Sequence, residues 1–284
     1  MKRILVPTDF SNNAFKALQF AAEIAVRNNA VIHLLHVLQL LKSPYIENEE
    51  SRKEFNQQML AETNMKLREE CHRLTIEVPV ETVPVIATGP LEARIIKCCE
   101  DRHIDLIVMG TQGASGLREI ILGSVSANVM DQSHIPVIAV PFEYKWERPD
   151  KFLFATNQFE KDEKILAPLT QLVQLFGAQL QVGIFTDQDD AEAANFFEDG
   201  HNLQNYTMDL RGKYPGSNIV AQHLAGSDFE EVLQAHIETD GIDLIAMVKY
   251  EKSFIENLFS RSLTKKMAYH AVVPILAIPA GNKN

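Results

Sequence analysis

Glycines recur at close intervals in the segment VMGTQGASGLREIILGSVSANV. Gly110, Gly113 and Gly116 lie three residues apart, and Gly123 is followed directly by Ser124. Glycine lacks a Cβ and tolerates positive φ, so a backbone rich in glycine can turn tightly and approach a ligand closely. A helix that begins near Ser124 would add free N–H groups and the positive end of its dipole, which favour phosphate. The segment therefore predicts an anion site that is built mainly from backbone.

Residues that could bind the rest of a nucleotide end two predicted strands. Pro7, Thr8 and Asp9 end the first strand, and the Asp9 carboxylate could accept hydrogen bonds from a ribose hydroxyl or an amine. Val37 ends the second strand and can offer its backbone groups to a base. In open parallel sheets, ligands bind outside the carboxyl ends of the strands, where the strand order reverses. Two simpler interpretations stay open: the glycine segment is only a turn, or Asp9 caps the next helix.

Other chemical motifs are absent or incomplete. No lysine follows the glycines as a P-loop requires, the glycine run does not follow the first strand, and G-x-S-x-G is missing. His33 and His36 fall on opposite faces of a strand, and Cys71-His72 lacks partners at metal spacing. We therefore predict neither a catalytic residue nor a metal site.

Apolar strands alternate with helical patterns in the first half of the chain. RILVPT, AVIHLLHVL, VPVETVPVIAT, DLIVMG and IPVIAVP are predicted strands. Helices are expected after the capping residue Ser11, from about Arg52 to Leu74, after Pro90 and near Ser124. Nearly continuous apolar strands separated by helices favour an α/β fold, in which a mostly parallel five-stranded sheet carries helices on both faces.

The pattern then repeats. KFLFATNQF matches RILVPTDF, so that Leu153 lies 148 residues after Leu5. DLIAM matches DLIVM, so that Asp243 lies 138 residues after Asp105. A duplication of this length predicts two homologous domains.

We assign the first predicted domain to residues 1–145 and the second to residues 149–284, with the join near EYKWERPDK. The net charge of −11 argues against nucleic-acid binding, which needs a basic surface. The first apolar run is too short for a signal peptide, and no segment resembles a membrane span. The three cysteines form no disulfide framework. A cytoplasmic location is therefore expected.

The spaced glycines and the strands around them resemble one known family. Gly110, Gly113, Gly123 and Ser124 match the G-2x-G-9x-G-[S/T] pattern of universal stress proteins of the ATP-binding kind. ILVPTDFS is similar to that family's first strand and turn, VMGTQG to its fourth-strand exit, and PVIAVP to its last strand.

The resemblance implies a tandem pair of Rossmann-like domains of the adenine nucleotide α hydrolase type, with ATP, alone or with Mg²⁺, or AMP in the first. It implies that the last strands of the two domains, IPVIAVP and VPILAIP, pair within the chain, and a homodimer stays open. It also implies that the adenosine and phosphates contact Pro7, Asp9, Val37, Met109, Gly110, Gly113, Gly123, Ser124 and Val125.

The second half departs from the pattern at the site. Val248, Glu251 and Arg261 stand where the first half has its glycines, and Asn157 replaces Asp9. We therefore predict that only the first domain binds nucleotide. The leading hypothesis is a stress-response sensor or regulatory module that ATP binding controls. The alternatives are a slow ATPase and a nucleotide-independent dimerisation scaffold.

Overall fold

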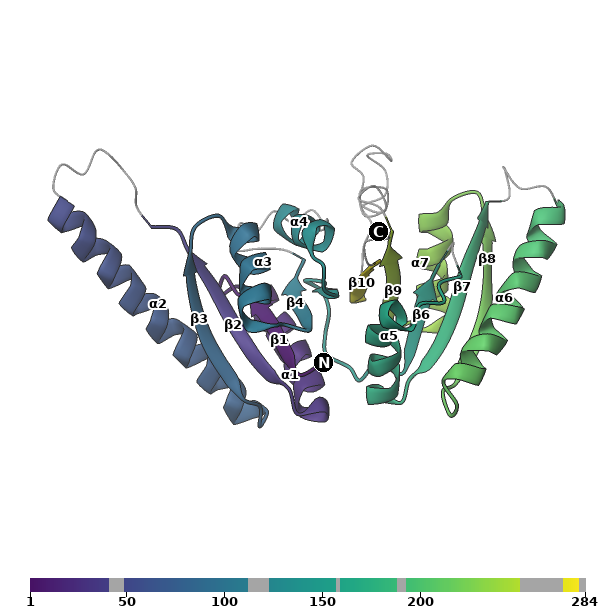
Figure 1. Cartoon of the computed structure of the whole chain (residues 1–284), viewed down its shortest axis with the longest axis horizontal. Coiled ribbons are helices and arrows are strands. Elements are labelled where there is room, and N and C mark those ends of the chain that lie inside the picture. Colours follow the sequence, from purple (N-terminus) through teal and green to yellow (C-terminus); the bar gives the residue numbers. More distant parts are fainter. Residues whose placement is uncertain (41–48, 112–122, 157–158, 188–192, 251–272, 281–284) are drawn as a thin grey trace. The chain divides into compact units, whose positions relative to one another are not determined.

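The chain folds into two compact units. The computed structural model describes residues 1–40, 49–111, 123–156, 159–187, 193–250 and 273–280 (Figure 1). One unit comprises Met1–Arg118 and Leu122–Phe142, and the other comprises Glu119–Ile121 and Glu143–Asn284. The division falls just before the predicted join.

The first unit is built on five parallel strands in the order β3-β2-β1-β4-β5. β1 and β4 are nearly all buried, which explains their uninterrupted apolar sequences. The chain runs outward from β1 through β2 to β3 and then crosses to β4 on the other side. The strand order therefore reverses between β1 and β4. The strands span Arg3–Pro7 (β1), Val31–Leu38 (β2), Thr82–Thr88 (β3), Leu106–Gly110 (β4) and Val137–Val140 (β5).

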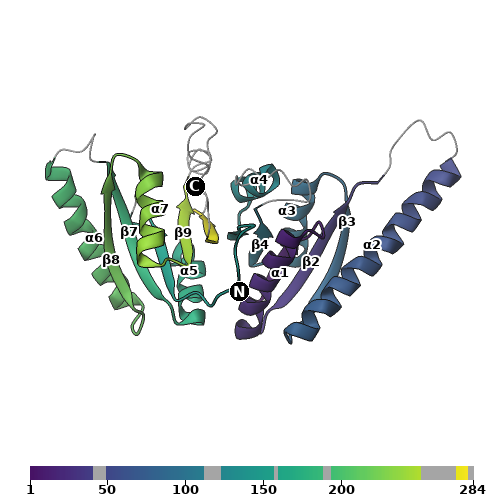
Figure 2. The same ribbon diagram turned by 180° about the vertical axis from the view of Figure 1, so that it is seen from behind.

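Helices cover both faces of this sheet. α1 contacts α2, since the Arg73 guanidinium lies 3.4 Å from the centre of the Phe15 ring. α3 packs beside α4, and Figures 1 and 2 show α1 and α3 on opposite faces of the strands. The predicted fold class, a mostly parallel open α/β sheet with helices on both faces, is confirmed. The helices span Asn12–Asn28 (α1), Glu49–Glu77 (α2), Leu91–Arg102 (α3) and Ser124–Gln132 (α4).

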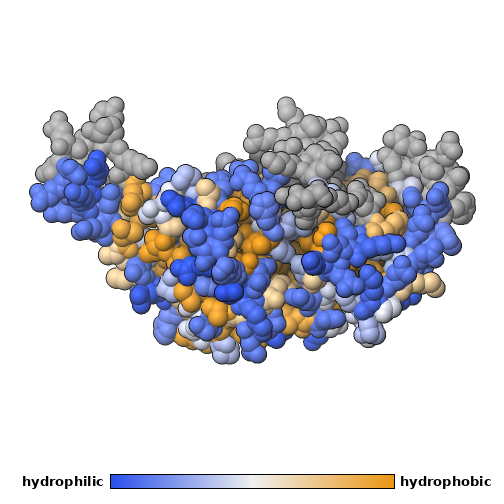
Figure 3. Space-filling view, in the orientation of Figure 1, coloured by the Kyte–Doolittle hydropathy of each residue, from blue (hydrophilic) through white to orange (hydrophobic). Residues whose placement is uncertain are grey.

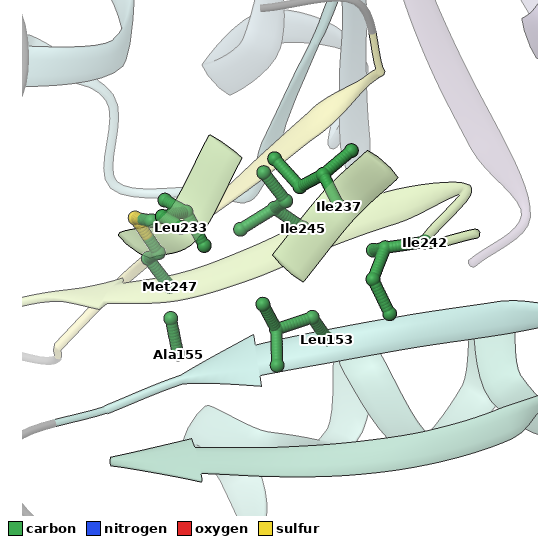
Figure 4. Packing of buried hydrophobic residues seen from close by; sticks show 7 residues of the cluster. All are labelled: Leu153, Ala155, Leu233, Ile237, Ile242, Ile245 and Met247. Atoms are coloured by element: carbon green, nitrogen blue, oxygen red, sulfur yellow. The ribbon is translucent and has the colours of Figure 1, made fainter. Parts of the chain in front are cut away.

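The second unit has the equivalent arrangement, with parallel strands in the order β10-β9-β6-β7-β8. Leu153, Ile245 and Met247 from its central strands pack against Leu233 and Ile237 of α7 in a buried cluster (Figure 4). The elements span Lys151–Ala155 (β6), Glu163–Phe176 (α5), Gln179–Asp187 (β7), Ala193–Lys213 (α6), Ile219–Gly226 (β8), Phe229–Asp240 (α7), Leu244–Lys249 (β9) and Ile275–Pro279 (β10).

The two units repeat individual hydrogen bonds at the sequence offsets of 148 and 138 residues. Asp105 Oδ2 accepts the N–H groups of Lys2 and Arg3, and Asp243 Oδ2 accepts those of Asp150 and Lys151. The backbone follows the same rule: the bond from Thr8 to Leu35 recurs from Thr156 to Gly183, and that from Ile107 to Pro136 recurs from Ile245 to Pro274. Both offsets therefore align positions with the same structural role.

The helix α2 differs from the others in composition. Four of its side chains are buried, and all four lie in its second half, at Thr63, Leu67, Cys71 and Leu74. Its first turns form one of the hydrophilic areas of the surface in Figure 3. Within the described parts of the chain, no helix is long and apolar enough to cross a membrane.

Candidate functional site

Gly110, the last residue of β4, is a glycine because another side chain occupies the place of its Cβ. A Cβ added there would lie 2.5 Å from Asn13 Oδ1 and 2.7 Å from Asn13 Cγ. Asn13 is only 1% exposed, and its Nδ2 donates to Val140 O at 3.1 Å. The Asn13 amide therefore ties the first turn of α1 to the carboxyl ends of β4 and β5.

The two ends of the glycine segment are held together. Gly123 N donates to Thr111 O at 2.6 Å, and Thr111 N donates to Val140 O at 3.0 Å. The Ser126 hydroxyl donates to Gly110 O at 2.7 Å. The exit of β4 and the start of α4 therefore form one fixed unit. The predicted ligand residue Gly113 lies outside the described residues.

The amino end of α4 has the features expected of an anion site. Gly123 is the N-cap residue and has no side chain to accept a bond from the first turn. The first N–H groups of a helix have no helical acceptor, so this end can donate to an anion and offers the positive end of the dipole. Ser124 is exposed and Val125 is half-buried, whereas the neighbouring strand residue Met109 is buried.

The turn after β1 has an unusual backbone. Phe10 adopts φ 64°, in the left-handed region that a bulky residue rarely enters. Asp9 Oδ1 accepts the Ser11 N–H at 3.0 Å, and Ser11 Oγ accepts the Ala14 N–H at 3.1 Å. The alternative that Asp9 caps the helix is therefore wrong, because Ser11 is the cap. The exposed Asp9 is held by a local turn beside the end of β1.

Thr8 is engaged by the protein at every polar group. Its N–H donates to Leu35 O at 2.8 Å, and its carbonyl accepts from His36 Nδ1 at 2.8 Å. Its hydroxyl donates to Glu70 Oε2 at 3.2 Å and accepts from Phe10 N at 3.0 Å. Thr8 is 7% exposed, so its observed contacts orient the turn.

Glu70 is an acidic residue of this edge that sequence reasoning missed. Burial raises the pKa of its carboxyl group, the Thr8 bond and Arg73 lower it, and Asp9 raises it further. Asn13 was also missed, although a polar residue on the apolar stripe of α1 was a usable signal. Glu70 lies on a largely polar helix, so no such signal marked it.

The predicted site residues gather at the carboxyl ends of adjacent strands. Pro7 ends β1, Gly110 ends β4, and the start of α4 is bonded to the exit of β4. Val37 lies near the end of the neighbouring strand β2, is half-buried, and pairs in register with Ala87. The strand order reverses between β1 and β4, so this edge is where an open parallel sheet binds a ligand.

The second unit presents different chemistry at the corresponding edge. Tyr250, directly after β9, donates its hydroxyl to Glu160 Oε2 at 2.9 Å, and Tyr206 of α6 donates to Glu160 O at 2.6 Å. Val248 stands where β4 has Gly110. Glu160 therefore places a carboxylate between the exits of β6 and β9. The residues Asn157, Glu251 and Arg261 lie outside the described residues.

The cysteines and possible metal ligands show no further site. Cys71, Cys98 and Cys99 are buried and free of disulfides. Burial raises the pKa of the Cys99 thiol to about 12. Over the part of the chain that the structure describes, no group of three His, Cys, Asp or Glu side chains could hold a metal ion.

Comparison with known proteins identifies the family. The model of the "Universal stress protein family" matches residues 1–141. The universal stress protein MJ0531 of Methanocaldococcus jannaschii is 31% identical over 140 residues, which cover 49% of this chain and 81% of that protein. The chain belongs to the universal stress protein family. A second universal stress protein of that organism, MJ0577, is 31% identical over 153 residues, covering 49% of this chain and 94% of that protein.

A solved structure extends the likeness in fold to the whole chain. The universal stress protein from Archaeoglobus fulgidus has a TM-score of 0.66 and 21% sequence identity, and the match covers 98% of both chains. The family model and the relatives in sequence cover about half of this universal stress protein, whereas the likeness in fold includes the second unit.

Proposed function

We propose that the first unit binds an adenine nucleotide, ATP by the family resemblance, at the carboxyl edge of β1 and β4. One observation carries the proposal: Thr111 and Gly123 fix the two ends of the glycine segment at the point where the strand order reverses. This arrangement presents the uncapped start of α4 at the edge of the sheet, where free N–H groups favour phosphate. Thirteen described or neighbouring positions are not needed to hold the charge, because backbone donors suffice.

The proposed ligand contacts divide by chemistry. Gly113, Gly123, Ser124 and Val125 would bind the phosphates through N–H groups and the Ser124 hydroxyl. Pro7, Asp9, Val37, Met109 and Gly110 would surround the adenosine. Thr8 would support them from inside the protein, as its internal bonds suggest. A bound Mg²⁺ would neutralise phosphate charge.

Residues 149–284 are proposed as a second domain of the same family that has lost this site. The repeated hydrogen bonds of Asp105 and Asp243 support a common origin. A carboxylate at Glu160 would repel a phosphate. The protein would then act in the cytoplasm as a nucleotide-controlled regulatory module with one active site per chain. Pairing of the last strands, within the chain or between copies, belongs to the same proposal.

Native mass spectrometry and calorimetric titration of ATP with Mg²⁺ test the proposal. We expect one nucleotide per chain and no binding by Gly113→Glu, which adds a carboxylate to the phosphate site. Ser124→Ala should weaken binding by up to about tenfold, because one hydrogen bond to a charged group is lost. Ser262→Ala, at the corresponding position of the second unit, is the matched control and should bind as the wild type does.

Two results would redirect the proposal. No binding by the wild type would leave the dimerisation scaffold as the leading function. Binding with steady release of ADP would favour the slow ATPase over the regulatory module.

A further inference from the structure

The long helix α2 contributes a carboxylate behind the turn that carries Asp9. Glu70 Oε2 lies 3.2 Å from Thr8 Oγ1, which in turn lies 3.0 Å from Phe10 N. A carboxylate can only accept, so the hydroxyl donates its proton to Glu70 and accepts from Phe10. The Thr8 hydroxyl therefore connects α2 to the backbone on the other side of Asp9.

The bond to Phe10 matters because this residue is in a strained conformation. A bulky residue at φ 64° persists only where its surroundings enforce it. The Phe10 ring stacks on the His36 imidazole with 4.6 Å between centroids, and His36 Nδ1 donates to Thr8 O. The turn is therefore held from β2 by His36 and from α2 by Glu70.

We propose that Glu70 is a positioning residue for Asp9 in the nucleotide site and acts through the Thr8 hydroxyl. By accepting the Thr8 proton, Glu70 directs a lone pair of Oγ1 at the Phe10 N–H. The turn that results holds Asp9 Oδ1 on the Ser11 N–H and sets the direction of the carboxylate. The inference rests on the proposed function, because Asp9 has a ligand to orient only if the first unit binds a nucleoside.

The surroundings of Glu70 fit this role. The charged groups that act on it are Arg73, one turn along α2, and Asp9 on the turn. Arg73 is itself held over the Phe15 ring of α1. The adjacent Glu69 is exposed and therefore offers a matched residue with the same charge.

The test measures ATP affinity by calorimetry on the full chain. Glu70→Leu should weaken binding about tenfold, the loss expected from one hydrogen bond. Glu70→Gln keeps an acceptor for Thr8 and should stay within about twofold of the wild type. Glu69→Gln, the control, should bind normally. Thr8→Val should weaken binding as Glu70→Leu does, and combining the two should add nothing.

Each contrary result has a distinct meaning. Normal ATP affinity in Glu70→Leu would overturn the inference and leave the proposed function intact. Additive losses in the double variant would also overturn it, since Glu70 would then act without Thr8. Equal weakening by Glu70→Gln and Glu70→Leu would show that charge matters and not the acceptor. No ATP binding by the wild type would overturn the proposed function and the inference together.

Discussion

Adding one methyl group at Gly110 should destabilise the first unit by collision with Asn13. In Gly110→Ala, the new Cβ would meet Asn13 Oδ1 at 2.5 Å, Cγ at 2.7 Å and the backbone carbonyl carbon at 3.1 Å. Carbon atoms pack best at about 3.5–4.0 Å, so all three contacts are too close. Overpacking of this kind costs about 1–3 kcal/mol of unfolding free energy.

Removing the Asn13 side chain should relieve most of that cost. Asn13→Ala alone should cost about 1 kcal/mol, because it loses a hydrogen bond to Val140 O while Thr111 N still donates to that oxygen. Two of the three close contacts with Gly110→Ala involve the Asn13 side chain. The double variant should therefore be more stable than the sum of the two losses predicts, by about 1–2 kcal/mol.

Hydrogen exchange followed by mass spectrometry is the suitable assay, since it reports stability locally. The only tryptophan, Trp146, packs on Phe176 of the second unit, so its fluorescence does not follow the first unit. A loss of 1–3 kcal/mol should speed exchange in β1 and β4 by about 5- to 150-fold, with peptides of β6 and β9 unchanged. Additive losses, or normal exchange together with lost ATP binding, would refute the role assigned to Asn13.

Three further predictions concern charged groups. Burial, chiefly, and Lys151 lower the pKa of His236 against the opposing effect of Asp240, so the folded second unit binds a proton less readily than the unfolded chain. Its stability, followed by Trp146 fluorescence in urea, should therefore fall as pH decreases below about 6.5, and His236→Gln should lose this part of the dependence. Asp243→Ala should lower the stability reported by Trp146 by about 1 kcal/mol, whereas Asp105→Ala should speed hydrogen exchange only in the first unit; effects on the opposite units would contradict the repeat. Because the pKa of Glu70 is raised, its ionised form destabilises the folded unit, so Glu70→Gln should slow hydrogen exchange in β1 at neutral pH, and faster exchange would contradict this sign.

The regular part of the fold was predictable because it depends on local pattern. Uninterrupted apolar runs such as RILVPT are typical of strands buried on both faces, and both offsets of the repeat align residues with matching hydrogen bonds. Ser11 was expected to begin the first helix, and the structure confirms it as the cap. Asp9 had two roles open because the pattern alone does not distinguish a ligand residue from a cap.

The contacts that set the site geometry were not predictable, because they join residues distant in sequence. Asn13 and Gly110 are 97 positions apart, and only their packing explains why glycine is needed. Glu70 and Thr8 are 62 positions apart, and α2 has too few buried residues to show from sequence which side chains face β1. Periodicity indicates the face of a helix and not the partner of a single polar atom.

The hydrogen bond between Gly123 and Thr111 makes the intervening stretch of chain replaceable. The sheet fixes both ends of that stretch at one point, so its length and sequence can change without moving β4, β5 or α4. The entropy cost of closing a loop grows only slowly with its length, by about 0.6 kcal/mol per doubling. A ligand-binding segment attached in this way can be exchanged between related domains, or lost from one of them, while the scaffold folds as before.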